Sequence, residues 1–287
     1  MRVLIFGATG LLGKALVRVW RDDEITALGS KDCDVRSAES VLRTVDKHRP
    51  DWIVMAAAYT DVDDCESNQQ LAFDVNTQGA LNVAEAAKQS GSRLLFLSTD
   101  YVFDGEKATP YETDDVRSPR GRYAKSKADA EVGILEILPR GCIARTSWVF
   151  GTGGRCFPAT ILKLAESREQ LEVVMDQRGC PSYTIDLARA IRELCHRDAS
   201  GIVHVTNAGD CTWFDLAVHL LREAGSTTVV KPTTTDKFPR PAPRPKYSVL
   251  SPASLHRYGI HMPDWRDAVR RYLGERSTAG INSPPTE

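Results

Sequence analysis

Short apolar runs alternate with amphipathic stretches along the first half of the chain. Runs that are apolar at every position are typical of strands buried on both faces, whereas apolar residues three and four apart are typical of helices. This alternation predicts an α/β fold with a doubly wound parallel sheet, covered by helices on both sides. The predicted strands are Arg2–Phe6, Ile25–Leu28, Asp51–Ala57, Arg93–Ser98 and Cys142–Arg145, and the predicted helices are Leu12–Trp20, Ala38–Lys47, Leu71–Gln89 and Lys125–Ile137.

The alternation loosens after about residue 150. Helical patterns return at Phe157–Glu166, Thr184–Cys195 and Phe214–Ala224, and Ile202–Val205 has the pattern of one more strand. The stretch Pro232–Pro252 is rich in proline, which predicts irregular structure. Long irregular segments in compact proteins often serve a function.

We therefore divide the chain into three parts. We expect a main domain over residues 1–150 and a smaller region over residues 151–275, of which residues 201–206 return to the main sheet. Residues 276–287 contain glycine and two adjacent prolines and are expected to form a flexible tail.

Composition and charge exclude several classes of protein. The chain has 287 residues, of which 42% are hydrophobic and 26% charged, an ordinary globular composition. A net charge of −1 gives no electrostatic reason to expect nucleic acid or an anionic membrane as a partner. The apolar run at the N-terminus is too short for a signal peptide or a membrane span. We expect a cytoplasmic protein.

Cysteine and histidine spacing argues against a metal site. The seven cysteines are an odd number and include no C-x-x-C pair, and the six histidines lack the spacing of metal ligands. The sequence therefore predicts free thiols in a reducing compartment and no metal ligands.

A glycine-rich turn, Gly7-Ala-Thr-Gly10-Leu-Leu-Gly13, follows the first predicted strand and opens the first predicted helix. Glycine is needed where the chain turns sharply and where the backbone approaches a pyrophosphate, and a helix N-terminus offers free N–H groups to phosphate. Residues 1–150 are therefore predicted to form a Rossmann domain that binds a dinucleotide. The cofactor-binding residues expected in this turn are Gly7, Gly10, Leu11, Leu12 and Gly13.

The spacing G-x-x-G-x-x-G resembles the extended branch of the short-chain dehydrogenase/reductase superfamily. That resemblance implies that an aspartate beyond the second strand reads the adenine, a position held here by Asp34 and Val35. Small side chains at the end of the third strand let a cofactor lie against the backbone. The residues in that position are Ala56, Ala57 and Ala58.

The choice between NADP and NAD is made near the end of the second strand. An acidic residue there binds the free ribose 2′-hydroxyl, whereas a basic or small residue admits the 2′-phosphate. The chain has Ser30 and Lys31 there, with no carboxylate before Asp32. This favours NADPH as the cofactor, with NADH as the alternative.

Tyr123 and Lys127 lie four residues apart at the start of a predicted helix and therefore share one face. A nearby ammonium favours the phenolate, so Lys127 is predicted to lower the pKa of Tyr123. Such a tyrosine can protonate an alkoxide as hydride arrives, and the lysine can hold the nicotinamide ribose. Thr99 follows a strand at its carboxyl end, where parallel sheets bind ligands. We predict Tyr123, Lys127 and Thr99 as the catalytic group.

Further strings extend the resemblance along the chain. Together with the glycine turn and the Tyr123/Lys127 pair, they resemble the dTDP-4-dehydrorhamnose reductase family over residues 1–273. Membership would imply NADPH-dependent reduction of the C4 keto group of dTDP-4-dehydro-6-deoxy-L-mannose to give dTDP-L-rhamnose. The strings are Ser98-Thr-Asp-Tyr-Val-Phe-Asp-Gly105, Arg145-Thr-Ser-Trp-Val-Phe-Gly151, Asp176-Gln-Arg-Gly-Cys-Pro181 and Arg244-Pro-Lys-Tyr-Ser-Val-Leu250.

The resemblance also implies roles for individual residues. Thr99 and Asp100 would contact the sugar, Trp148 would lie against it, and Tyr123 would protonate O4 after hydride reaches C4. The late segment with Arg244 and Ser248 resembles the part that closes over the nucleotide. An arginine there suits a diphosphate, since the guanidinium fork matches phosphate oxygens.

Two positions depart from the family pattern. Relatives often carry Asn-Asn-Phe where this chain has Arg155-Cys156-Phe157, and Arg155 is expected to take over a phosphate contact. Ser182 stands where threonine is usual. These departures leave open which 4-ketosugar and which nucleotide are bound.

Three other functions are known for proteins of similar sequence: a dehydratase, a 4-epimerase and a regulatory subunit. A dehydratase of the same superfamily would need a second carboxylate after Asp100, where this chain has Tyr101. A 4-epimerase usually retains its NAD, so release of free NADP⁺ would distinguish a reductase. A non-catalytic NADP-binding regulatory subunit would turn over no ketosugar.

The assembly is expected to be a monomer or homodimer; some relatives hold Mg²⁺ between subunits, but its ligands have no identifiable counterpart here.

Overall fold

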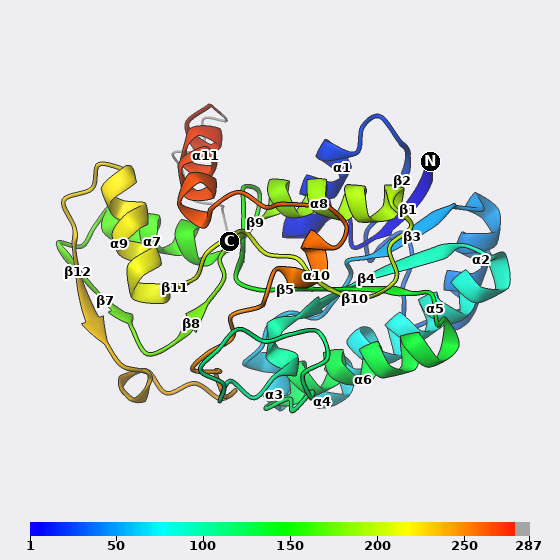
Figure 1. Ribbon diagram of the computed structural model, residues 1–287, viewed down its shortest axis with the longest axis horizontal. Coiled ribbons are helices and arrows are strands. Elements are labelled where there is room, and N and C mark those ends of the chain that lie inside the picture. Colours follow the sequence, from blue (N-terminus) through cyan, green and yellow to red (C-terminus); the bar gives the residue numbers. More distant parts are fainter. Residues whose placement is uncertain (279–287) are drawn as a thin grey trace.

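A six-stranded parallel sheet forms the centre of the larger part of the molecule (Figure 1). The computed structural model describes residues 1–278, and the strands lie in the order β10-β5-β4-β3-β1-β2. Every neighbouring pair is parallel, so the predicted doubly wound sheet is confirmed. The strands are β1 (Arg2–Phe6), β2 (Glu24–Leu28), β3 (Trp52–Met55), β4 (Arg93–Thr99), β5 (Cys142–Thr146) and β10 (Gly201–His204).

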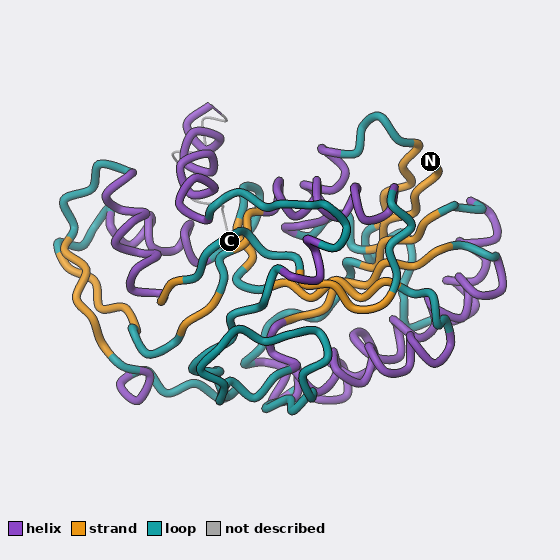
Figure 2. The backbone as a smooth tube through the Cα atoms, in the orientation of Figure 1, coloured by secondary structure: helices purple, strands orange, loops and turns teal. Residues whose placement is uncertain are grey.

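Helices cover both faces of this sheet (Figure 2). Side chains of a strand alternate between faces, so Val3 and Ile5 enter one core while Leu4 and Phe6 enter the other. Helices α1 and α8 complete the first core, and α2, α5 and α6 complete the second. Their bounds are α1 (Leu11–Val19), α8 (Thr184–His196), α2 (Ala38–His48), α5 (Gly79–Ser90) and α6 (Arg122–Ile137).

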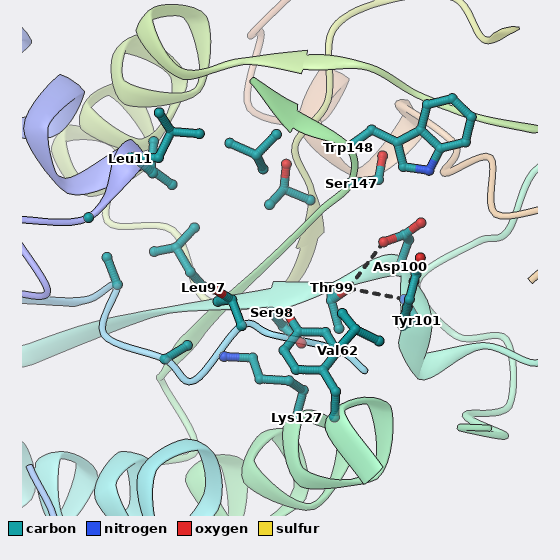
Figure 3. Close-up of a pocket in the computed structure, with 18 of the residues that line it drawn as sticks. Leu11, Val62, Leu97, Ser98, Thr99, Asp100, Tyr101, Lys127, Ser147 and Trp148 are labelled. Atoms are coloured by element: carbon teal, nitrogen blue, oxygen red, sulfur yellow. Dashed lines mark hydrogen bonds between the residues drawn. The ribbon is translucent and has the colours of Figure 1, made fainter. Parts of the chain in front are cut away.

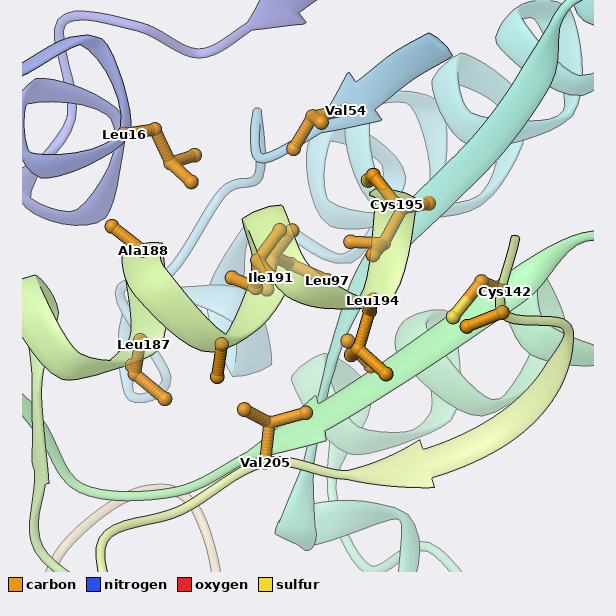
Figure 4. Close-up of a cluster of buried hydrophobic side chains, with 14 of the residues drawn as sticks. Leu16, Val54, Leu97, Cys142, Leu187, Ala188, Ile191, Leu194, Cys195 and Val205 are labelled. Atoms are coloured by element: carbon orange, nitrogen blue, oxygen red, sulfur yellow. The ribbon is translucent and has the colours of Figure 1, made fainter. Parts of the chain in front are cut away.

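Helix α8 is essential to the main sheet although it comes late in the sequence. Its residues Leu187, Ile191 and Leu194 pack on the same face of the sheet as Val54 and Leu97 (Figure 4). Strand β10 then pairs with β5, which places residues 201–204 in the main sheet. The short helix α10 (Ala253–His256) packs on β10 in turn.

The predicted helix Leu71–Gln89 is interrupted in the structure by a π-helical turn, η1 (Asp74–Gln78), between α4 (Gln69–Phe73) and α5. Such turns are frequent at functional sites. This one carries the buried Asn76, whose amide donates hydrogen bonds to the Tyr59 carbonyl and the Ser126 hydroxyl, both at 3.0 Å. Asn76 thus ties the segment after β3 to helix α6. The short helix α3 (Asp64–Ser67) precedes α4.

A smaller region lies beside the sheet. We call it the second region, and it consists of strands β6, β7, β8, β9, β11 and β12 and helices α7, α9 and α11. It packs around its own apolar core, which includes Phe150, Leu216 and Trp265. Its helices are α7 (Phe157–Ala165), α9 (Trp213–Glu223) and α11 (Trp265–Thr278); its paired strands are β7 (Gln170–Val174) with β12 (Val229–Thr233), β6 (Val149–Phe150) with β9 (Ser182–Tyr183), and β8 (Arg178–Gly179) with β11 (Cys211–Thr212).

Three features of the second region differ from the prediction. Pro232 and Thr233, expected in irregular structure, belong to β12, where a proline is tolerated because the two-stranded sheet leaves an outer edge. The sequence analysis did not predict α11. Its last turn occupies residues 276–278, where the flexible tail was expected to begin; residues 279–287 of that expected tail lie outside the described residues.

Candidate active site

A cavity of about 450 Å³ opens where the main sheet meets the second region (Figure 3). Its walls come from the turn after β1, the carboxyl ends of β3, β4 and β5, helix α6 and the start of α9. Open parallel sheets bind ligands at this edge. The predicted site residues that line the cavity are Gly10, Leu11, Leu12, Gly13, Ala56, Ala58, Thr99, Asp100, Tyr123, Lys127 and Trp148.

The glycine turn is built for close backbone approach. Gly7 has φ +85°, and a Cβ there would lie 2.4 Å from the Ala57 nitrogen. A Cβ at Gly13 would lie 2.1 Å from the Gly7 carbonyl oxygen, so the start of α1 packs directly on the turn. Gly10 caps α1 without a side-chain hydrogen bond, which leaves the first N–H groups facing the cavity. Gly7 and Ala57 therefore pack against each other and support the turn, but they do not line the cavity.

The segment after β2 lies beyond the cavity wall. Ser30 and Lys31 are exposed, and Val35 is buried against Gly79. The Asp34 carboxylate accepts hydrogen bonds from the Arg36 side chain at 2.6 to 3.0 Å, and these bonds lower the pKa of Asp34. Arg36 was missed by the sequence analysis, although it is the second basic residue to follow the strand.

Thr99 and Asp100 form one hydrogen-bonded group at the end of β4. The Thr99 hydroxyl donates to Oδ1 of Asp100 at 3.1 Å and accepts from the Tyr101 N–H at 3.2 Å, as Figure 3 shows. Tyr123 lines the same cavity, and Thr99 acts to lower its pKa. The structure thus brings the predicted tyrosine and threonine into one cavity.

Burial dominates the protonation of Tyr123 and Lys127. Burial raises the pKa of Tyr123 above its ordinary 10.0, although Thr99 opposes that rise. Burial also lowers the pKa of Lys127 to about 7, and the negative charge of Glu131 opposes that fall. The sequence predicted a lowered pKa for Tyr123, whereas desolvation of the phenolate raises it in this structure.

Asp100 is also buried, and it meets the late segment of the chain. Burial raises its pKa to about 7, while hydrogen bonds from Ser248 and Thr99 oppose the rise. Arg244 forms an ion pair with Asp63, with Nη2 at 3.0 Å from Oδ1. Ser248 and Arg244 therefore do not line the cavity. Ser248 lies next to Asp100, and Arg244 pairs with the segment before α3.

Two stacked indoles form the wall on the side of the second region. The rings of Trp148 and Trp213 lie 3.5 Å apart at 6°, and the Phe157 ring lies 4.5 Å from Trp213. Trp148 has φ +46°, a left-handed backbone conformation. A Cβ at residue 179 would lie 2.6 Å from the Trp148 ring, so position 179 requires glycine. Trp213 was missed by the sequence analysis; its only signal was an aromatic residue directly before a predicted helix.

Arg155 lines the cavity from the loop that follows β6. The loop is held beside the glycine turn, because Lys14 donates to the Gly153 carbonyl at 2.6 Å and Gly154 packs on Leu11. Other lining residues that the sequence did not single out are Thr60, Val62, Leu97, Ser98, Tyr101, Thr146, Ser147 and Val149.

Two features, a cluster of metal ligands and a membrane-spanning helix, are absent from residues 1–278. Within residues 1–278, no three His, Cys, Asp or Glu side chains are grouped so that they could hold a metal ion. No helix in the same range is both long and apolar enough to span a membrane. All seven cysteines are free thiols, as the sequence predicted.

Comparison with known proteins places the chain in a family. Residues 1–278 match the family described as RmlD substrate binding domain. A probable dTDP-4,6-dihydroxy-2-methyloxan-3-one 4-ketoreductase of Streptomyces antibioticus is 40% identical over 292 residues, covering 100% of this chain and 98% of the relative. The dTDP-4-dehydrorhamnose reductase of Streptomyces griseus is 39% identical over 278 residues, covering 93% and 91% respectively.

A solved structure supports the same family. The crystal structure of dTDP-4-dehydrorhamnose reductase from Bacillus anthracis strain Ames, in complex with NADP, superposes with a TM-score of 0.93 at 36% identity. The match covers 96% of this chain and 99% of that one. The family resemblance predicted from the sequence is confirmed: this chain belongs to the dTDP-4-dehydrorhamnose reductase family.

Proposed function

We propose that the protein uses NADPH to reduce the C4 keto group of dTDP-4-dehydro-6-deoxy-L-mannose, giving dTDP-L-rhamnose. The observation that carries this proposal is the Thr99–Tyr123–Lys127 group, which lies in the same cavity as the N-terminus of α1. The names of the Streptomyces griseus and Bacillus anthracis relatives support the substrate, and the NADP in the latter supports the cofactor.

The main-sheet side of the cavity fits a dinucleotide. Gly7 and Gly13 let the turn and the start of α1 pack directly on the backbone, and the free N–H groups at the start of α1 suit a pyrophosphate. When bound, the dinucleotide supplies hydride for C4 of the sugar. The residues proposed to hold it are Gly7, Gly10, Leu11, Leu12, Gly13, Ser30, Lys31, Asp34, Val35, Ala56, Ala57, Ala58, Tyr123 and Lys127.

Tyr123 is the proposed proton donor. Because burial raises its pKa, the phenol keeps its proton at neutral pH until a stronger base, the C4 alkoxide, forms beside it. Thr99 donates a hydrogen bond to the same oxygen, and Lys127 holds the nicotinamide ribose. General acid catalysis of this kind contributes roughly 10²- to 10⁴-fold to a rate.

The second region is proposed to hold the sugar nucleotide. Trp148, backed by Trp213, offers a flat apolar face to a sugar ring, while Asp100 offers a buried carboxyl group that accepts from Thr99. Arg155, which lines the cavity, is the proposed diphosphate contact from this side, and Arg244 would join it only by leaving Asp63. Residues 1–150 would thus serve mainly the cofactor and residues 151–275 mainly the sugar nucleotide.

The experiment that tests the function is a set of assays that follow loss of reduced nicotinamide absorbance. The L-mannose-derived ketosugar with NADPH is expected to give the highest kcat/KM, with release of free NADP⁺. Faster turnover of the epimeric dTDP-4-keto-6-deoxy-D-glucose would point to another 4-ketosugar, a second candidate supported by a Streptomyces niveus relative named dTDP-4-keto-6-deoxy-D-glucose reductase.

Two further outcomes are informative. Binding of NADPH without turnover of any ketosugar would instead identify a regulatory subunit. Size measurement by light scattering would distinguish a monomer from a homodimer, and fractionation would check the predicted cytoplasmic location.

A further inference from the structure

Glu131 is a fully buried carboxylate one helical turn beyond Lys127 in α6, with 0% of its side chain exposed. Its oxygens accept hydrogen bonds from the Ser98 hydroxyl at 2.5 Å, from Arg145 at 2.9 and 2.7 Å, and from Arg117 at 3.3 Å. None of these donors belongs to α6. A buried carboxylate held by two guanidinium groups is an anion fixed in position.

The donors connect Glu131 to the strands that end at the cavity. Ser98 directly precedes Thr99 at the end of β4. Arg145 lies in β5 just before Thr146, which lines the cavity, and its own side chain is 1% exposed. Arg145 also stacks over Phe103, with its guanidinium carbon 4.9 Å from the ring centre. Helix α6 is thereby attached to two strands at the cavity floor.

Lys127 is a buried cation with few neighbours to balance its charge. It is 2% exposed, and its Nζ lies 3.9 Å from the centre of the Phe96 ring. Within residues 1–278, its ammonium forms no ion pair with a carboxylate. Residues four apart on a helix share a face, so Glu131 is its nearest anion on α6.

Other titratable groups surround this pair. Those on the cavity side are Tyr123 from α6, Asp100 and Tyr101 from the turn after β4, and Arg155 from the loop after β6. Those around Glu131 are Arg145 from β5, Arg117 from the loop before α6, and His204 from β10, whose Nε2 lies 3.5 Å from Arg145. The carboxyl group of Asp100 is the only other acid among them, and burial favours its neutral form.

We propose that Glu131 is a positioning residue: its buried negative charge favours the cationic form of Lys127, and its hydrogen bonds hold α6 against β4, which ends at Thr99, and β5, which leads to Trp148. The charge effect rests only on the geometry described here, whereas its use in hydride transfer rests on the proposed function. A cationic Lys127 can donate three hydrogen bonds to a ribose, and a neutral one donates fewer.

The test measures the titration of Lys127 directly, by NMR of protein labelled with ¹³C at lysine Cε and without any ligand. The Lys127 signal is assigned by its loss in Lys127→Arg. In Glu131→Gln the Lys127 pKa is expected to fall from about 7 by about 1 unit, because the anion that favours the charged form is gone. Asp129→Asn is the matched control, since Asp129 is exposed on the same helix and pairs with Lys125 at 3.0 Å.

Two further variants distinguish charge from packing. Ser98→Ala removes a hydrogen bond without changing a charge, so it should lower the melting temperature and leave the Lys127 titration in place. If Glu131→Gln fails to fold, the double variant Glu131→Gln/Arg145→Met removes both charges together, a change that buried ion pairs often tolerate. There the loss of the Arg145 cation offsets part of the loss of the anion, so a smaller downward shift is expected.

An unchanged Lys127 titration in folded Glu131→Gln, or an upward shift in the double variant, would overturn the proposal. The kinetic counterpart is the alkaline limb of kcat, which should move to lower pH in Glu131→Gln and stay in place in Asp129→Asn. Because the NMR titration uses no sugar nucleotide, its result stands whether or not the proposed reaction is observed.

Discussion

The two sides of the cavity are built by different means. On the main-sheet side, Thr99 and Lys127 are buried and sit on a strand end and a helix that pack within a continuous core. On the side of the second region, Trp148, Trp213 and Arg155 are partly or largely exposed and come from a strained residue, a helix start and a loop.

This difference fits the separate duties proposed for the two sides. Reacting groups need fixed geometry, which a rigid sheet supplies, whereas a substrate wall can vary among relatives without disturbing the chemistry. Relatives at 40% and 39% identity are indeed named for different deoxysugar ketones. We therefore expect changes on the main-sheet side to affect kcat and changes in the second region to affect KM.

The largest expected effect comes from Tyr123→Phe. Loss of the proton donor should reduce kcat by about 10³-fold, within the range of general acid catalysis. NADPH affinity, measured by fluorescence, should stay near that of the unmodified protein because the ring and its packing are kept. Turnover close to the original rate would remove Tyr123 from the mechanism and break the proposed division.

Asp100→Asn is expected to change stability in a pH-dependent way. The folded pKa of Asp100 is raised to about 7, so the carboxyl group stays protonated in the folded protein between pH 4 and 7 while the unfolded chain ionises. Stability therefore falls as pH rises through this window, and the full cost is present above it. The asparagine variant should be more stable at pH 8, by up to about 4 kcal/mol, and unchanged near pH 3. Urea unfolding at both pH values measures this, and an equal effect at both would contradict the burial argument.

Trp213→Ala should affect binding of the sugar nucleotide. Removing one half of the stack is expected to raise KM for the sugar nucleotide by about tenfold, the equivalent of about 1.4 kcal/mol, with kcat nearly unchanged. Trp213→Phe keeps an aromatic face and serves as the control. A fall in kcat at unchanged KM would mean that the second region also positions the reacting groups.

The smallest expected effect is in Lys31→Ala. If Lys31 binds the 2′-phosphate, kcat/KM with NADPH should fall by several-fold to about tenfold, as for one hydrogen bond to a charged group. The value with NADH should not change. Lys47→Ala, an exposed lysine near the end of α2, provides the control. Equal losses with both cofactors would leave Arg36 as the remaining candidate.

The sequence predicted the main-sheet side well because its features are local. The strand pattern, the glycine turn and the Tyr123/Lys127 spacing each depend on residues a few positions apart, and the sheet rules then bring Thr99 to the same edge. The sequence could not predict that Trp213 stacks on Trp148, because that contact joins residues far apart through a region with no repeating pattern. Protonation was mispredicted for a related reason. The spacing of Tyr123 and Lys127 shows that they are neighbours but not how far water is excluded from them.

The path of the chain through helix α8 has a consequence for any attempt to separate the two regions. The backbone leaves the main sheet after β5, returns for α8 and β10, leaves again through α9 and β12, and comes back once more at α10. A fragment ending at residue 150 would lose α8 and uncover Val54 and Leu97, so it should aggregate rather than fold as an independent nucleotide-binding unit. Because several crossings join the two regions, a motion that opens the cavity would have to bend all of them together.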